Sequence, residues 1–178
     1  MKTLLALMTI CGGILVMTAC HKSNNNNNSN TNLPNFDQIF LDQAARANLA
    51  EVDAGNVAIT NALDTSVKSF GQQMVGEHGQ AYTDLKNVAS GYNYTSLPST
   101  ADSAHILAKD SLMALSGMNF DTTYMSQQIA DHQHTILVFT AEMQGGSGAA
   151  RDYAVKYLPI IQGDLAKADS IMAHLMQR

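Results

Sequence analysis

Cysteine is nearly absent from the chain. The 178 residues include two cysteines, Cys11 and Cys20, and both lie close to the N-terminus. The remainder of the chain therefore has no thiol with which to form a disulfide or to ligate a metal ion. Any stabilising or metal-binding group in the folded part must come from other side chains.

Several sequence patterns that identify common functions are also missing. The chain has no basic cluster, and 10 Lys and Arg are outnumbered by 15 Asp and Glu, which argues against nucleic-acid binding. No Gly-rich phosphate loop, nucleophile elbow or cysteine-based catalytic motif is present. We therefore assign no catalytic residues.

The sequence also lacks the patterns typical of strands. Apolar and polar residues show little alternation and alanine is abundant, which argues against strands.

Residues 1–19 have the parts of a bacterial lipoprotein signal peptide. Lys2 precedes an apolar run from Leu4 to Met17, which is followed by Thr18, Ala19 and Cys20. The run is too short and too early for a convincing transmembrane span. The similarity to lipoprotein signals implies cleavage before Cys20 and acylation of this cysteine, which would attach the protein to a membrane. Cleavage would remove Lys2 and change the net charge from −5 to −6.

The Asn-rich segment that follows, residues 20–34, is expected to be a polar tether, because it cannot bury a core. His21 rather than Asp follows the cysteine, which favours the outer membrane over inner-membrane retention. We therefore expect a lipid-anchored protein of the cell envelope that faces the periplasm. The sequence does not identify a protein partner.

Residues 35–178 are expected to form one all-α domain. Four stretches, at about 37–62, 65–90, 120–144 and 148–176, have apolar residues at helical spacing. A capping pattern from Ser99 to Asp102 predicts a shorter helix over 101–115, which would cross between the second and third long helices. The fold expected is an antiparallel four-helix bundle with this crossover helix.

Each long apolar stripe is interrupted near its middle by one ionisable side chain. These side chains are Glu51, His78, His132 and Asp164. Because midpoints of antiparallel helices share a layer, the pattern predicts that the four groups meet in the core as a metal site. Neighbouring acidic side chains are candidates for hydrogen bonds to the metal ligands. These are Glu77, Asp131 and Glu142.

The segments around these side chains resemble the bacterial family catalogued as domain of unknown function 4142. The matching segments are FLDQAARANLAEV, QQMVGEHGQAYTDL, FDTTYMSQQIADHQ and YLPIIQGDL. The resemblance implies an exported ferritin-like bundle with no established activity. Family members often have histidine where this chain has Asp164, and aspartate is also a competent ligand.

The donor set suits a single iron, manganese or zinc ion. The Glu-x-x-His motif of di-iron bundles is missing, because Val75 and Ile129 stand three residues before the two histidines. Redox chemistry at such an ion would be the best enzymatic hypothesis, although the sequence favours a protein that is not an enzyme.

Two alternatives remain open. The four groups could form a metal-free hydrogen-bonded network in a structural or interaction module of the envelope. Met74 and Met125 could join the histidines to hold Cu(I) or silver, a less favoured hypothesis. Histidines outside the stripes, including His105 and His134, are expected to contact solvent.

Overall fold

The computed structural model describes residues 33–177, and five helices lie within this range. They are α1 (Asn35–Asn61), α2 (Thr65–Gly91), α3 (Ser103–Met113), α4 (Gly117–Gly145) and α5 (Gly148–Leu175). No strand occurs among the described residues, so the prediction of an all-α protein is confirmed. The predicted signal peptide, Cys20 and most of the tether lie outside the described residues.

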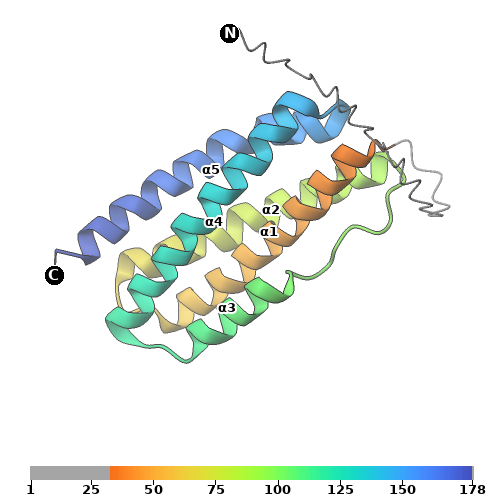
Figure 1. Ribbon diagram of the computed structural model, residues 1–178. Helices are drawn as coiled ribbons and strands as arrows, with labels where there is room; N and C mark the ends of the chain where they lie inside the picture. Colours follow the sequence, from red (N-terminus) through yellow and green to blue (C-terminus); the bar gives the residue numbers. More distant parts are fainter. Residues whose placement is uncertain (1–32, 178) are drawn as a thin grey trace, which may run out of the picture.

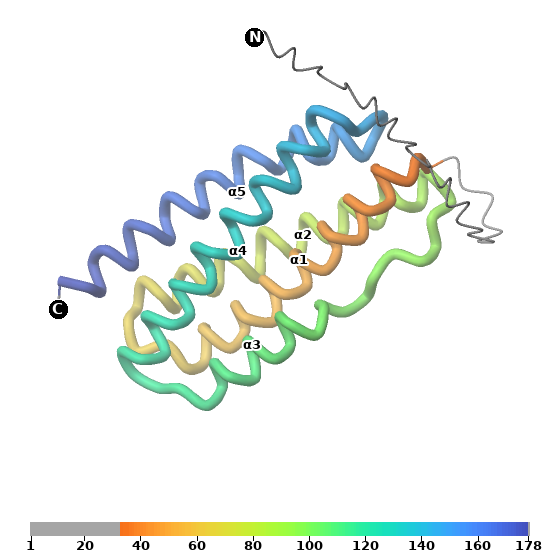
Figure 2. Tube along the Cα trace, viewed as in Figure 1, coloured from red at the N-terminus to blue at the C-terminus, as the bar shows by residue number. Residues whose placement is uncertain are grey.

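The four long helices lie side by side, and α3 runs along the outside of α1 (Figure 1). Helix α1 packs against α2 and α4, and α5 packs against α4 and α2. Short turns join α1 to α2 and α4 to α5, so each of these pairs is antiparallel. The longer connection through α3 returns the chain to the end of the molecule where α2 begins, as the tube in Figure 2 shows. Among residues 33–177, no helix has the length and apolar character that a membrane span needs.

Side-chain carboxylates fix the starts of two helices. Asp64 precedes α2 and accepts a hydrogen bond from the Ser66 backbone N–H at 2.8 Å. Asp102 does the same for α3 by accepting from the His105 N–H at 3.0 Å. Helix α3 therefore begins at Ser103, two residues later than the sequence predicted.

The turn between α1 and α2 is bound to the start of α4. The fully buried Asp121 carboxylate accepts hydrogen bonds from the backbone N–H groups of Leu63, at 3.0 Å, and Asp64, at 2.8 Å. Hydrogen bonds to a charged acceptor are stronger than neutral ones. This contact ties the first hairpin to the second half of the chain.

The backbones of α1 and α2 approach closely at two glycines. A Cβ atom added at Gly55 would lie 2.8 Å from the Gly71 carbonyl oxygen, and one added at Gly71 would lie 2.8 Å from the Ala58 Cβ. No larger side chain fits at either position without a shift of the backbone. The small residues Gly55, Ala58 and Gly71 thus permit the close approach of α1 and α2.

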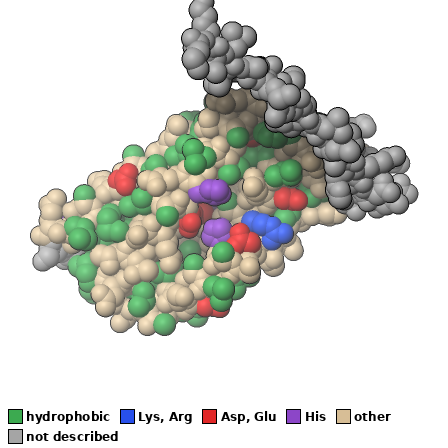
Figure 3. All heavy atoms as spheres, viewed as in Figure 1, with side chains coloured by type: hydrophobic (Ala, Val, Ile, Leu, Met, Phe, Trp, Pro, Cys, Tyr) green, Lys and Arg blue, Asp and Glu red, His purple; other side chains and the backbone are tan. Residues whose placement is uncertain are grey.

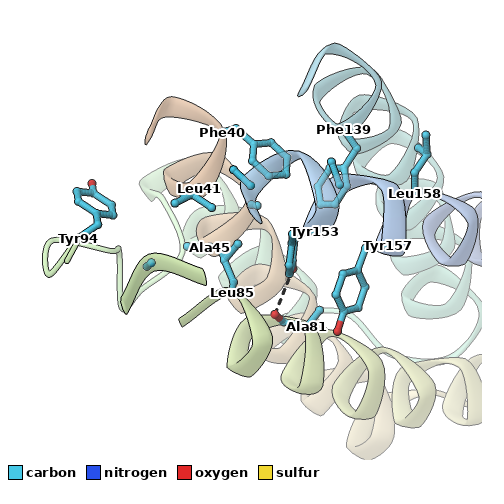
Figure 4. Packing of buried hydrophobic residues seen from close by; sticks show 14 of the residues in the cluster. Phe40, Leu41, Ala45, Ala81, Leu85, Tyr94, Phe139, Tyr153, Tyr157 and Leu158 are labelled. Carbon is cyan, nitrogen blue, oxygen red and sulfur yellow. Dashed lines mark hydrogen bonds between the residues drawn. The ribbon is translucent and has the colours of Figure 1, made fainter. Parts of the chain in front are cut away.

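Two apolar clusters fill the interior. The first, shown in Figure 4, contains Phe40 and Phe139, whose ring centroids lie 5.0 Å apart, and Tyr153, which donates a hydrogen bond to the Ala81 carbonyl at 3.1 Å. The second contains Phe70, Tyr124 and other buried residues toward the opposite end. On each long helix, the ionisable residue of the stripe falls between the residues of the two clusters. A polar layer therefore separates two apolar layers.

Candidate metal centre

The polar layer is built around two buried histidines. His78 lies at the middle of α2 and His132 one residue past the middle of α4. Their side chains meet edge to face, with ring centroids 5.7 Å apart and an interplanar angle of 87°. The helical stripe points both rings inward, because the apolar residues on the same face of each helix are buried as well.

Hydrogen bonds determine which ring nitrogen of each histidine carries the proton. The Nδ1 atom of His132 lies 2.8 Å from the Gln128 carbonyl oxygen, which can only accept, so Nδ1 is the donor. The Nδ1 atom of His78 lies 2.9 Å from the side-chain oxygen of Asn48. The Asn48 amide nitrogen donates elsewhere, to the Ala44 carbonyl and to the Tyr153 hydroxyl. Each neutral imidazole therefore presents a lone pair at Nε2.

Asp164 of α5 completes a group with the two histidines. One ligand atom from each of His78, His132 and Asp164 lies within 4.8 Å of the others. The Asp164 Oδ1 atom accepts a hydrogen bond from the Gln73 amide at 2.7 Å, and Gln73 in turn accepts one from Lys167. We call these three residues the His–His–Asp group.

Glu51 is the fourth predicted ligand and lies beside this group. Its Oε1 atom is 3.7 Å from Nδ1 of His132, the nitrogen already bonded to the Gln128 carbonyl. The Glu51 side chain thus approaches the ring at the nitrogen that lacks a lone pair. A small space of about 10 Å³ adjoins Glu51, His78 and His132, which is room for about one water molecule.

Several polar atoms in this layer are buried without a hydrogen-bond partner among the described residues. They are Oε2 of Glu51, Oε2 of Glu77, Oε1 of Gln128, Nε2 of His132 and Oδ2 of Asp164. Buried polar atoms in folded proteins are normally paired, because losing water without gaining a partner costs about 1–3 kcal/mol. Two of these atoms, on His132 and Asp164, belong to the His–His–Asp group.

Burial favours the neutral forms of the histidine and acidic side chains in this layer. Burial, reinforced by the neighbouring His132, lowers the pKa of His78 to about 3, and burial also lowers the pKa of His132. Burial raises the pKa of Glu51 to about 8, although a side-chain hydrogen bond with Gln128 opposes the shift. The pKa of Asp164 rises to about 7, first through burial and then through the nearby Glu77. Both imidazoles are thus in the neutral form that ligates metals.

The three predicted neighbours of the metal ligands lie in different places. Glu77 is close enough to Asp164 to raise its pKa. Asp131 faces α3, where its Oδ1 atom lies 3.8 Å from Nε2 of His105. Glu142 is ten residues beyond His132 on the same helix, or about 15 Å along its axis. The structure therefore does not bring Glu142 to the His–His–Asp group; its buried carboxyl group lies near Asp37 instead.

Three amide residues with contacts in the layer were missed by the sequence analysis. Asn48 and Gln128 orient the two histidines, and Gln73 holds Asp164. A signal existed for Asn48, which lies one helical turn before Glu51 on an otherwise small and apolar face. For Gln128 the contact with His132 is made by the backbone carbonyl, which any residue type would supply, whereas the contact with Glu51 is made by its side chain.

The remaining histidines and methionines have other surroundings. Met74 and Met125 are fully buried in the second apolar cluster, with Phe70 and Tyr124. His134 is exposed, as predicted. The expectation of solvent contact was incomplete for His105, because its ring is partly buried with Nδ1 2.9 Å from Asp102.

Comparison with known proteins identifies a family for the chain. The model of the family described as domain of unknown function (DUF4142) matches residues 22–171. No curated protein and no solved structure matches the chain. The match covers nearly all of the helical region, including His78 and His132.

Proposed function

This chain belongs to the DUF4142 family, and we propose that it binds one divalent transition-metal ion through Nε2 of His78, Nε2 of His132 and Oδ2 of Asp164. The observation that carries the proposal is the pair of buried, unpartnered atoms on His132 and Asp164, in a group whose ligand atoms lie within 4.8 Å. A bound ion would satisfy both atoms at once.

The donor set and its supports fit iron, manganese or zinc. Two imidazoles and one carboxylate with open positions occur in non-haem iron and in zinc sites. Ligand atoms around such an ion lie about 3.4 Å apart, and one ligand atom from each residue of the group lies within 4.8 Å of the others, so ion binding would draw the three side chains together. Metal-bound histidines usually donate their other ring N–H to an acceptor, and Asn48 and the Gln128 carbonyl already fill this role.

A metal-free network is the main alternative. Such a network would be favoured if the carboxyl groups and imidazoles satisfied one another. Gln128 forms a side-chain hydrogen bond with Glu51, and Glu77 forms one with Asp164. However, the distance of 3.7 Å between Glu51 and His132 is too long for a hydrogen bond, and Nε2 of His132 has no partner among the described residues. These contacts support a ligand-binding layer over one that is complete by itself.

The arrangement of the helices supports a fold of the ferritin-like type. Four long helices with one long crossover connection are typical of this type, and proteins that have it hold metal ions between facing helices. The His–His–Asp group draws on α2, α4 and α5, and Glu51 adds α1. The missing Glu-x-x-His motif supports a single ion rather than a di-iron centre.

The metal content of the purified protein tests the proposal. After incubation with Fe²⁺, Mn²⁺ or Zn²⁺ and removal of excess metal, we expect about one ion per chain, with a melting temperature that falls when a chelator removes it. His78→Gln and His132→Gln should each abolish binding, because each removes one nitrogen ligand.

His174→Gln is the matched control, because His174 is exposed near the C-terminal end of α5 and should not affect binding. A wild-type protein that retains none of these ions, and whose melting temperature does not respond to them, would contradict metal binding. The inert network would then be the better interpretation.

We also propose that the protein is lipid-anchored in the cell envelope through Cys20. The support is the sequence of residues 1–20, in which a lysine and an apolar run precede the cysteine. An acyl anchor followed by a polar tether would hold the helical region beside a membrane, with the outer membrane favoured by His21.

A further inference from the structure

A pocket on the molecular surface lies between α1, α3 and α4, beside the polar layer. Its volume is about 170 Å³. Figure 3 shows histidine, acidic and basic side chains gathered near the middle of the face that these helices present. The residues that matter for its chemistry are Arg46, Glu51, Asp102, His105, Asp131 and His134. We call this cavity the α3 pocket.

The α3 pocket and the histidine pair share a wall. Glu51, Ala47 and Thr135 line the α3 pocket and also the space of about 10 Å³ that adjoins His78 and His132. The Glu51 side chain is 8% exposed, and its Oε2 atom has no partner among the described residues. A buried carboxyl oxygen that is free to accept a ligand therefore stands between the outer pocket and the imidazoles.

The carboxyl groups and imidazoles that line the α3 pocket can bind a cation that moves from solvent toward the histidine pair. His105 of α3 lies between two carboxyl groups, with Nδ1 2.9 Å from Asp102 and Nε2 3.8 Å from Asp131. His134 is near enough to act on the charge of Asp131. With Glu51, three carboxyl groups and two imidazoles line the pocket, and the exposed Arg46 is its one permanent cation.

The other side of the histidine pair offers no comparable opening. The space beyond His78 has a volume of about 10 Å³, and Asn48 and Glu77 line it together with aromatic and branched side chains. Its lining holds one carboxyl group, that of Glu77, whereas the lining of the α3 pocket holds three. Access from the α3 side is therefore favoured by the larger volume and by the greater number of carboxyl groups that can replace the water of a hydrated ion.

We propose that the α3 pocket is the port through which a divalent cation reaches and leaves the His–His–Asp group, with the Glu51 carboxyl group receiving the ion at the floor of the pocket. This inference rests on the proposed function, because it needs an ion at the histidines. Glu51 lies beside Nδ1 of His132, so its carboxyl group does not fit as a ligand of an ion that is bound to Nε2 of the same ring. Its position does allow it to pass the ion from the α3 pocket to the histidines.

Substitutions that fill the α3 pocket test the proposal through the rates at which the ion binds and dissociates. With the purified full chain and Co²⁺ as a coloured probe, Ala47→Leu should slow association and dissociation by the same factor, roughly tenfold, and leave the Kd unchanged. A larger side chain in the pocket raises the energy barrier to both entry and exit of the ion and leaves the energy of the bound state unchanged. Gln43→Trp, at an exposed position on the rim, is a second plug that does not depend on packing between helices.

Ala166→Leu, on an exposed part of α5 away from the pocket, is the matched control and should exchange Co²⁺ at the wild-type rate. Circular dichroism checks that both pocket-filling variants are folded. If the wild type binds Co²⁺ and both variants exchange it at the wild-type rate, the proposed entry route is wrong, while the proposed metal site is retained. If the wild type binds no Co²⁺, and no Fe²⁺, Mn²⁺ or Zn²⁺ in the content measurement, the proposed function fails and the port with it.

Discussion

At the scale of single residues, the polar layer depends on which atom of each side chain is already in use. His78 and His132 each have Nδ1 engaged by an acceptor, so Nε2 is the nitrogen left for a ligand. Glu51 reaches the engaged nitrogen of His132, and Asp164 joins the group defined by ligand distances. Residue type alone does not distinguish these two carboxyl groups, since both are acidic and both are buried.

Glu142 gives a test of pH-dependent stability at the same scale. Burial, and secondarily Asp37, raises its pKa from 4.5 to about 7, so the folded state binds a proton more tightly than the unfolded chain. This group stabilises the fold fully below pH 4.5, and its contribution is lost as the pH rises to about 7. The wild type should therefore lose stability between pH 5 and pH 8, and Glu142→Gln should lose less. The difference in the free energy of unfolding between the two pH values should be smaller in the variant.

Urea denaturation of the metal-free protein at both pH values measures this effect. Glu51 and Asp164 also have raised pKa values, so the pH dependence of the variant should shrink without vanishing. Asp169→Asn, at an exposed position, serves as the control. An unchanged difference between pH 5 and pH 8 in Glu142→Gln would rule out this account of Glu142.

At the scale of secondary-structure elements, helix position along the bundle axis decides which groups meet. The four ionisable residues of the stripes lie within three residues of the middle of their helices, so they share one layer. Glu142 lies near the end of α4 and misses the layer. Helix α3 was predicted as a connection, and the structure adds that it presents His105 toward Asp131.

The pairing of α1 and α2 predicts opposite effects of one substitution at two glycines. Gly71→Ala should destabilise the fold by about 1–3 kcal/mol, because the new methyl group would meet the Ala58 Cβ and the Gly55 carbonyl oxygen. Gly76→Ala, on the same helix with nothing within 4 Å, should stabilise it by about 0.5–1 kcal/mol through helix propensity. Chemical denaturation of the two variants and the wild type measures both effects. Equal effects at the two positions would show that the close approach is not present in solution.

At the scale of the whole molecule, a polar layer divides the interior into two apolar clusters. Each long helix contributes to both clusters, so the layer is closed off at its two ends by packed side chains. Openings to the layer lie at the sides, between helices, and the larger of those described above is the α3 pocket. This layout supports the proposal that an ion enters from the face that α3 borders.

The proposed anchor is tested on the whole chain expressed in a bacterium that exports lipoproteins. The wild type should partition into the detergent phase of a Triton X-114 extract, and its N-terminal peptide should begin at an acylated Cys20. Cys20→Ala should move the protein to the aqueous phase, whereas Cys11→Ala should not, because Cys11 lies within the predicted signal. A mature chain that still begins at Met1, with partitioning indifferent to Cys20→Ala, would exclude the anchor.

The sequence by itself determined the helices and their buried faces. Helical periodicity is local, because backbone hydrogen bonds link residues four apart, so the stripes and the inward side of His78 and His132 follow from spacing alone. It also indicated the family, since the segments that resemble it span most of the helical region, and the family match confirms this.

Only the tertiary structure decided how the buried groups face one another. The bond from His78 to Asn48 joins residues 30 apart, and the group of His78, His132 and Asp164 joins three helices. Such contacts depend on the rotation of each helix about its axis and on side-chain rotamers, which periodicity does not specify. For the same reason the α3 pocket, whose walls come from three helices, has no signature in the sequence.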